Sequence, residues 1–241
     1  MTNQSLTDLS MQGLLSPLAS VERAAYELRS GRPVFVVNGT EDAAIVIATE
    51  MATSERIDDQ TNIAGGIRPH VVLTHYRAET LKIRLYTPEV VRIPYPDWLK
   101  VEQIRQLADP QFDLSDPMRG PFNSEREDVP AAIMSSVKLA KIGRLLPSVM
   151  AVPVPGITIG SHPEIVSVSA DEINEYDTRS AAGLRRVTAA NVPLIGAENA
   201  KIVAFRPEDG GTEHLAIVIG NPDPDTAVLI RLHSEGFTGD V

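Results

Sequence analysis

The stretch Pro33–Ala48 reads PVFVVNGTEDAAIVIA, two apolar runs separated by a short polar segment. Runs of five or six apolar residues next to turn residues predict buried strands, here Pro33–Val37 and Ala43–Ala48. Between them, Asn38-Gly39-Thr40 predicts a turn, since Gly tolerates the positive φ that tight turns require. We therefore expect the two strands to pair as a hairpin in the core of the fold.

Helices and strands are expected on both sides of this hairpin. SVERAAYELRSG predicts a helix that Ser20 caps and Gly31 ends. Further helices are expected in 129–147, with Pro130 in the first turn, and in 169–187, where Ser169 and Glu172 have capping-box spacing. Further strands are predicted from the segments VVLTH (71–75), LKIRLY (81–86), MAVPV (150–154) and EIVSV (164–168).

The middle and the tail of the chain have different patterns. Thr87–Asn123 contains six prolines, which predicts mostly loop with one short helix near Trp98–Leu107. The tail predicts a small antiparallel meander that begins near Pro193, with strands AKIVAF (200–205), HLAIVIG (214–220) and AVLIRLH (227–233). A domain boundary is expected between Asp177 and Pro193. The fold class is therefore α+β: a mixed α/β domain followed by antiparallel strands.

Composition excludes several kinds of function. The net charge of −10 argues against a broad nucleic-acid surface. No apolar run is long enough for a membrane span, and the N-terminus lacks the pattern of a signal peptide, so a cytoplasmic location is expected. The chain has no cysteine, which excludes disulfides and thiolate metal ligands. Few cations lie in the tail, too few for a polyphosphate pocket: Lys201, Arg206 and Arg231.

The last residues, RLHSEGFTGDV, carry the strongest motif. A His-Ser-Glu triplet followed by Thr-Gly-Asp at the end of a strand resembles GTP cyclohydrolase II, and RRVTAANVPLIGAENAKIVAF resembles the start of that domain. The resemblance implies that this segment lies against the GTP site. The candidate substrate-binding residues are Arg231, Leu232, His233, Ser234 and Glu235. Arg231 would pair with an anionic group and Glu235 would accept hydrogen bonds from the purine.

More faintly, the preceding chain resembles 3,4-dihydroxy-2-butanone 4-phosphate synthase, on VERAAYELRSGRPVFVV, SSVKLAKIGRLLPSVM and EIVSVSADEINEY. The departures from that family matter. Its acidic run is reduced to Glu41 and Asp42. Its His-Thr-Glu triplet corresponds to 132–134 (Ala-Ile-Met), and its later metal-binding Glu to about Pro153. These side chains cannot hold a hard cation, so the domain is expected to have lost its chemistry.

Three functions follow from the resemblances. The first is a GTP cyclohydrolase II homologue of riboflavin biosynthesis, which opens the guanine ring of GTP with release of formate and pyrophosphate. The family uses zinc held by three cysteines, and Gly236 stands at the first of those positions. We therefore expect no zinc, no metal site and no catalytic residue in this chain, which is expected to be truncated and inactive by itself. GTP would be the partner of the complete enzyme.

The second function is a non-catalytic dimerisation or regulatory module, since synthases of this kind are homodimers and a scaffold can outlive its active site. The third and weakest is a sugar-phosphate lyase with a rearranged site. The expected organisation has three parts: a flexible leader (1–19), a degenerate synthase-like domain (20–185) and an incomplete cyclohydrolase II domain (186–241).

Overall fold

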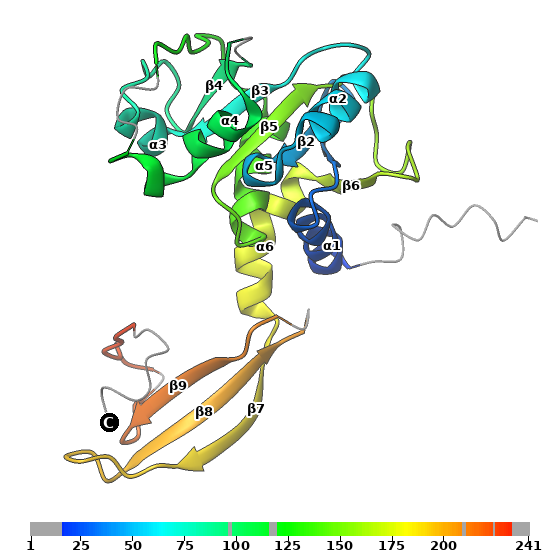
Figure 1. The fold of residues 1–241 in the computed structure, drawn as a ribbon. Helices are drawn as coiled ribbons and strands as arrows, with labels where there is room; N and C mark the ends of the chain where they lie inside the picture. Colours follow the sequence, from blue (N-terminus) through cyan, green and yellow to red (C-terminus); the bar gives the residue numbers. More distant parts are fainter. Residues whose placement is uncertain (1–15, 96–97, 116–119, 209–210, 224, 233–241) are drawn as a thin grey trace, which may run out of the picture. The chain divides into compact units, whose positions relative to one another are not determined.

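The computed structural model describes residues 16–95, 98–115, 120–208, 211–223 and 225–232. The chain divides into two compact units, Met1–Tyr176 and Asp177–Val241. The division falls within helix α6 (Ala170–Ala182). Each unit is built around its own sheet, so the predicted combination of a mixed α/β part and an antiparallel part is confirmed (Figure 1).

The first unit holds a six-stranded mixed sheet in the order β4-β3-β5-β2-β1-β6. All neighbouring strands are antiparallel except β1 and β6, which run parallel. The strands are β1 (Val34–Asn38), β2 (Asp42–Ala48), β3 (His70–Thr74), β4 (Val90–Pro94), β5 (Ser148–Pro153) and β6 (Val166–Ser169).

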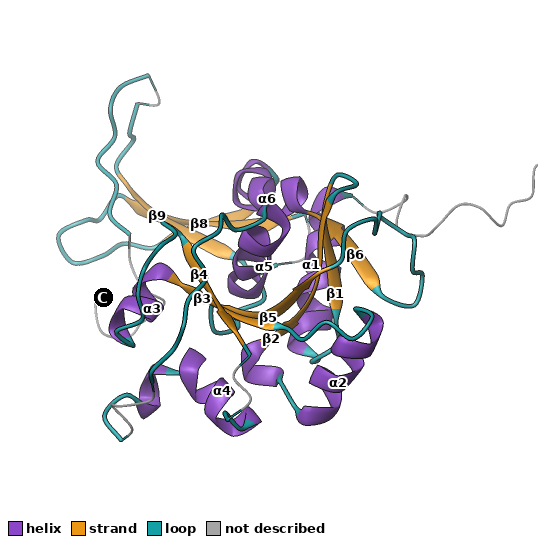
Figure 2. Ribbon diagram, turned by 90° about the horizontal axis from the view of Figure 1, so that it is seen from above, coloured by secondary structure: helices purple, strands orange, loops and turns teal. Residues whose placement is uncertain are grey.

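Helices cover both faces of this sheet (Figure 2). On one face, α1 (Pro17–Arg29), α5 (Ala131–Ile142) and the start of α6 pack in one hydrophobic cluster with strand residues such as Val36, Val46 and Val72. On the other face, α2 (Ser54–Ile63), α3 (His75–Thr80) and α4 (Val101–Ala108) contribute to a second cluster around Leu73 and Met150. Two short 3₁₀ turns, η2 (Thr49–Met51) and η3 (Pro110–Phe112), complete the described elements of this unit.

The predicted hairpin is confirmed. Phe35 of β1 pairs with Ile45 of β2, and the turn between the strands places Gly39 at a φ of 75°. The hairpin lies inside the sheet because β5 and β6 pair with its outer edges. Its apolar residues are covered on both faces, which explains why the sequence shows continuous rather than alternating apolar runs.

The first helix begins earlier than Ser20. Pro17 occupies the first turn, and the side chain of Ser16 accepts a hydrogen bond from the N–H of Ala19 at 3.3 Å. Proline is favoured at this position because its missing N–H has no partner there in any helix. The C-terminal end of the helix agrees with the prediction, since Gly31 follows it with a φ of 73°.

One strand prediction and one loop prediction in the middle of the chain were wrong. LKIRLY (81–86) is a turn and an irregular segment, and Lys82 adopts a φ of 57° directly after α3. Conversely, β4 lies within the proline-rich interval that was predicted to be mostly loop. A strand forms there because β4 is at the sheet edge, where proline is tolerated, and Pro94 is its last residue. The short helix predicted in the same interval is confirmed as α4.

The second unit is a three-stranded antiparallel sheet in the order β7-β8-β9. Its strands are β7 (Leu184–Asn191), β8 (Ala200–Pro207) and β9 (His214–Ile219). The predicted meander is therefore confirmed for β8 and β9, but its first strand is β7, of which residues 184–187 were expected to end the helix predicted over 169–187. The expected strand 227–233 is wrong for its described part, since 227–232 form no regular element.

Candidate functional site

The C-terminal candidate residues are only partly within the described structure. Arg231 and Leu232 lie in an irregular, exposed segment, and Leu232 is 94% exposed. His233, Ser234, Glu235 and Gly236 lie outside the described residues. The proposed contacts of 231–235 with GTP therefore stay a prediction.

The two parts of the synthase-like candidate site do meet in the fold. Asp42 opens β2, and its Oδ2 accepts a hydrogen bond from the backbone N–H of Ala132 at 3.2 Å and from Asn38 Nδ2 at 3.0 Å. Ala132 is in the first turn of α5, whose N-cap residue Pro130 supplies no side-chain acceptor. Asp42 therefore caps α5 from 90 residues away, in a place where a carboxylate also interacts favourably with the helix dipole.

The other positions of that candidate site are apolar. Ala132 and Ile133 are fully buried in the core beneath α5. Pro153 lines a shallow cavity of about 270 Å³ whose walls include Phe35 and His162 but no carboxylate. Glu41 is exposed in the turn before β2. Of the two carboxylates at this candidate site, Asp42 is thus already used as a helix cap and Glu41 points to solvent.

Removing the Asp42 side chain should be costly for stability. We expect Asp42→Ala to lower the free energy of unfolding by about 1–2 kcal/mol, because both Asn38 and the first turn of α5 lose their acceptor. Urea unfolding measures this change. Asp42→Asn keeps an acceptor and should recover part of the loss, while the exposed neighbour Glu41→Ala should stay within about 0.5 kcal/mol of the parent. Equal effects of Asp42→Ala and Glu41→Ala would contradict the capping role.

A cluster that sequence reasoning missed joins His70, Arg92 and Glu125. His70 Nε2 lies 2.8 Å from Glu125 Oε1, and Arg92 Nη2 lies 2.9 Å from Glu125 Oε2. The Arg92 side chain is only 8% exposed. Glu125 also donates its N–H to the carbonyl of Arg92 at 3.0 Å. The cluster binds Glu125, in the segment before α5, to β3 and β4 at the edge of the sheet. No local sequence motif indicates this cluster, because His70 and Glu125 are 55 residues apart.

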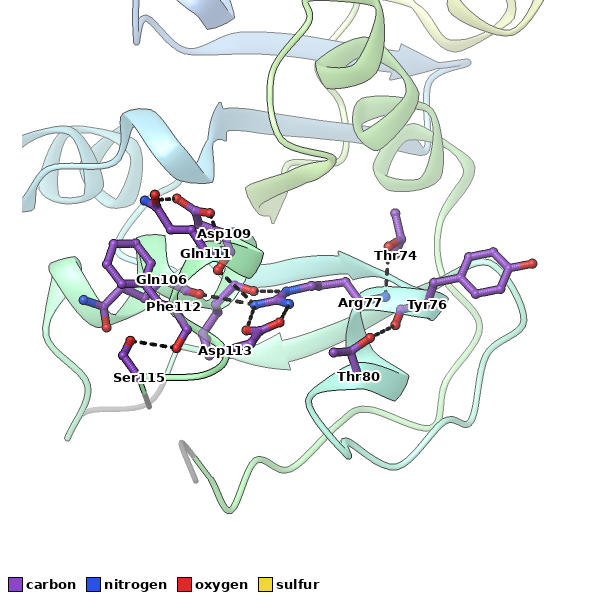
Figure 3. Close-up of polar contacts among 11 residues, drawn as sticks. Thr74, Tyr76, Arg77, Thr80, Gln106, Asp109, Gln111, Phe112, Asp113 and Ser115 are labelled. Carbon is purple, nitrogen blue, oxygen red and sulfur yellow. Dashed lines mark hydrogen bonds and ion pairs between the residues drawn. The ribbon is translucent and has the colours of Figure 1, made fainter. Parts of the chain in front are cut away.

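A second missed feature is Arg77 on α3 (Figure 3). Its Nη1 and Nη2 bind the two carboxylate oxygens of Asp113 at 2.6 and 2.8 Å. Its Nε donates to the carbonyl of Leu107 at 2.6 Å, and Nη2 also reaches the carbonyls of Gln106 and Asp109. These carbonyls belong to the C-terminal end of α4, where helix acceptors lack partners. Arg77 thus caps the C-terminal end of α4 and binds Asp113, both within the proline-rich interval.

The remaining histidines do not assemble a site. His75 Nδ1 lies 3.2 Å from the carbonyl of Thr87, whereas His70 contacts Glu125. His162 lies next to Glu164, and His214 opens β9 in an exposed position. Within the described ranges, no group of three or more His, Asp or Glu side chains could hold a metal ion.

No helix in those ranges is long and apolar enough to cross a membrane.

Comparison with known proteins defines the class. Residues 185–241 match the family model of GTP cyclohydrolase II. A GTP cyclohydrolase-2 of Azospirillum brasilense is 35% identical over 230 residues, which cover 93% of this chain and 59% of the relative. A GTP cyclohydrolase-2 of Xylella fastidiosa (strain 9a5c) is 27% identical over 231 residues, 91% of this chain and 53% of the relative. The riboflavin biosynthesis protein RibBA of Salinispora arenicola is 24% identical over 267 residues, 94% of this chain and 63% of the relative.

The chain is therefore a homologue of riboflavin biosynthesis proteins. More narrowly, its C-terminal residues 185–241 are homologous to GTP cyclohydrolase II, and the part before them resembles the synthase region of RibBA proteins. Both predicted resemblances are confirmed. The chain spans between half and two thirds of the length of these curated relatives.

The zinc that the cyclohydrolase resemblance implies does not fit the residues of this chain. Three thiolates would be needed, and the sequence contains no cysteine. Gly236, at the first of the three positions, has no side chain that could replace one.

Proposed function

We propose that this chain is a GTP cyclohydrolase II homologue whose N-terminal unit keeps a synthase-like scaffold without synthase chemistry, and which does not open GTP by itself. The observation that carries the proposal is the use of Asp42. Of the two carboxylates that remain of the acidic run, Glu41 is exposed and Asp42 caps α5 at Ala132, in the position that would correspond to the family's histidine. Fold and site chemistry are separable, so the scaffold can remain when its ligands are gone.

For the C-terminal part, the proposal concerns binding rather than chemistry. In a complete cyclohydrolase, Arg231 to Glu235 would lie against GTP, with Arg231 near an anionic group and Glu235 accepting hydrogen bonds from the purine. The tail has few cations to hold three phosphates, and it lacks the thiolates that would hold zinc. Ring opening with loss of formate and pyrophosphate would therefore need residues that this chain does not supply.

We expect the purified 241-residue chain to release no formate from GTP and to contain no stoichiometric zinc after exposure to the ion. The measurements are a coupled formate assay and elemental analysis of the desalted protein. The Azospirillum brasilense relative, treated identically, is the control for both. Formate release or one zinc per chain would overturn the proposal for the C-terminal part. Turnover of ribulose 5-phosphate with Mg²⁺ would overturn it for the N-terminal unit and restore the lyase alternative.

A second candidate function, a dimerisation or regulatory module, is favoured by the intact core of the first unit. Ala132 and Ile133, which correspond to part of the family's His-Thr-Glu triplet, now belong to a buried apolar cluster of α1, α5 and the central strands. This cluster also includes Val21, Leu28 and Val149. A core retained without ligands is what a structural role would require. A homodimer and a cytoplasmic location remain part of this proposal.

A further inference from the structure

The first unit carries an exposed tyrosine, Tyr86, with two arginines beside it. The guanidinium carbon of Arg126 lies 4.9 Å from the centre of the Tyr86 ring, which is a cation–π contact. A hydrogen bond from Arg84 is the main cause of a lowered pKa of the Tyr86 hydroxyl, and the positive charge of Arg126 acts in the same direction. All three residues are exposed. We refer to Arg84, Tyr86 and Arg126 as the Tyr86 site.

Burial alternates along the segment that carries Arg84 and Tyr86. Ile83 and Thr87 are buried, and Leu85 between them packs against the second hydrophobic cluster. Arg84 and Tyr86 occupy the intervening positions and are exposed. The segment forms no strand, but the burial of its apolar side chains still determines which of its residues face water. Arg84 and Tyr86 are thus held outward by the burial of their neighbours.

Arg126 reaches the same place from another segment. The Oγ of Ser124 donates a hydrogen bond to the carbonyl of Arg84 at 2.6 Å. The N–H of Glu125 donates to the carbonyl of Arg92 on β4 at 3.0 Å. These two hydrogen bonds fix the backbone directly before Arg126. Both segments of the Tyr86 site are therefore positioned in advance, which lowers the entropy that is lost when a ligand binds.

The two guanidinium groups of the Tyr86 site have no anionic partner. Within the described residues, no carboxylate pairs with Arg84 or Arg126, although the chain has 32 acidic and 22 basic residues. The acidic neighbours of Arg126 in the sequence, Glu125 and Glu127, both lie near Arg92 instead. Two positive charges beside one hydroxyl repel each other, and an anion bound between them removes this repulsion.

A second exposed tyrosine of the same unit provides a direct comparison. The guanidinium carbon of Arg32 lies 5.7 Å from the centre of the Tyr26 ring, so an arginine contacts the aromatic ring at both places. The third member differs. At Tyr26 it is the carboxylate of Glu27, which pairs with Arg32. At Tyr86 it is a second guanidinium group. Only the Tyr86 site therefore keeps its positive charge available for a ligand.

We propose that the Tyr86 site binds a phosphate dianion, either free or as the phosphomonoester of a small metabolite. A phosphomonoester carries nearly two negative charges at neutral pH, which match the two guanidinium groups. The planar guanidinium group of arginine binds phosphate oxygens through paired hydrogen bonds, and a tyrosine hydroxyl can donate a further one. None of these three residues belongs to the candidate sites at Asp42 or at 231–235.

Calorimetric titration of the full 241-residue protein with inorganic phosphate, ribose 5-phosphate and ribose tests this site in a buffer of low ionic strength. We expect one phosphate or ribose 5-phosphate per chain, with a Kd of about 1 mM because the site is open to water, and no binding of ribose. Arg84→Gln and Arg126→Gln should each weaken binding by about ten-fold, since each removes charged hydrogen bonds. Equal affinities for the two phosphate compounds would assign the site to the phosphate group alone, and tighter binding of ribose 5-phosphate would assign it to a sugar phosphate.

Arg32→Gln is the matched control, because it removes an exposed arginine that contacts a tyrosine ring but already has a carboxylate partner. It should change phosphate affinity by less than about two-fold. Since the substituted side chains are exposed, all variants should keep the melting temperature of the parent. No binding of either phosphate compound to the parent would overturn the proposal, as would equal losses from Arg32→Gln and Arg126→Gln.

The Tyr86 hydroxyl supplies an independent readout. A bound phosphate neutralises the two guanidinium groups, so the pKa of Tyr86 should rise toward its ordinary value. Ultraviolet titration of tyrosine ionisation with and without saturating phosphate measures this rise, and Tyr86→Phe should abolish it. A phosphate-induced rise that persists in Tyr86→Phe would place the bound anion at another tyrosine and would contradict the proposal.

Discussion

Replacing Arg77 by methionine should destabilise the first unit by about 3 kcal/mol. The substitution removes five hydrogen bonds, two to the carboxylate of Asp113 and three to carbonyls at the end of α4. The Arg77 side chain is 10% exposed and Asp113 is 26% exposed, so water only partly replaces the lost partner. Breaking a largely buried pair by deleting one member is therefore expected to cost much more than losing a surface ion pair.

The loss should be concentrated at α4. Hydrogen exchange should show weakened protection in the last turn of α4, and urea unfolding should give the overall change in stability. Arg105→Met is the matched control, because Arg105 lies on the exposed side of the same helix and should change stability by less than about 0.5 kcal/mol. Arg77→Lys should recover little, since an ammonium cannot bind both carboxylate oxygens and the carbonyls in one plane. Full stability of Arg77→Lys would mean that charge alone is sufficient and that the fork geometry is irrelevant.

The sequence was most informative where a segment is buried on both faces. The hairpin β1–β2 and the strands β3, β5 and β6 were all predicted, because continuous apolar runs require burial whatever their neighbours are. β4 and β7 were not predicted, each for a different reason. β4 lies among prolines that only a sheet edge tolerates, and β7 is a polar, mostly exposed strand that reads as the end of a helix.

The errors at LKIRLY (81–86) and AVLIRLH (227–233) have a common cause. Both have strand-like composition, but strand propensity expresses packing against neighbours, and neither segment has a pairing strand within the described structure. The site was predictable only in part for a related reason. A local motif indicated 231–235, whereas the contacts of Asp42 with α5 and of His70 with Glu125 join residues far apart in sequence.

The second large effect is expected from placing a carboxylate at Gln60. This side chain on α2 is fully buried, and its Nε2 donates to the carbonyls of Ile45 on β2 and Met150 on β5, both at 2.9 Å. In Gln60→Glu an ionised carboxylate would face two carbonyl oxygens without a donor. Burial raises the pKa of such a carboxyl by about 3 units, which corresponds to about 4 kcal/mol of lost stability at pH 7.

The pH dependence distinguishes this mechanism from a packing defect. A folded-state pKa raised above the unfolded value of about 4.3 means that the folded protein binds the proton more tightly, so stability is lost as pH rises from about 4 toward the folded pKa. Below that range the protonated acid still donates one hydrogen bond, and the cost should fall to about 1 kcal/mol. Gln60→Met removes both donors without adding charge, so its cost should not vary with pH. Asn62→Asp introduces the same charge at an exposed position of α2 and should show no comparable slope. Equal losses of stability for Gln60→Glu and Gln60→Met at every pH would contradict this mechanism. The new carboxylate would then be in contact with water, and side chain 60 would not be buried against β2 and β5.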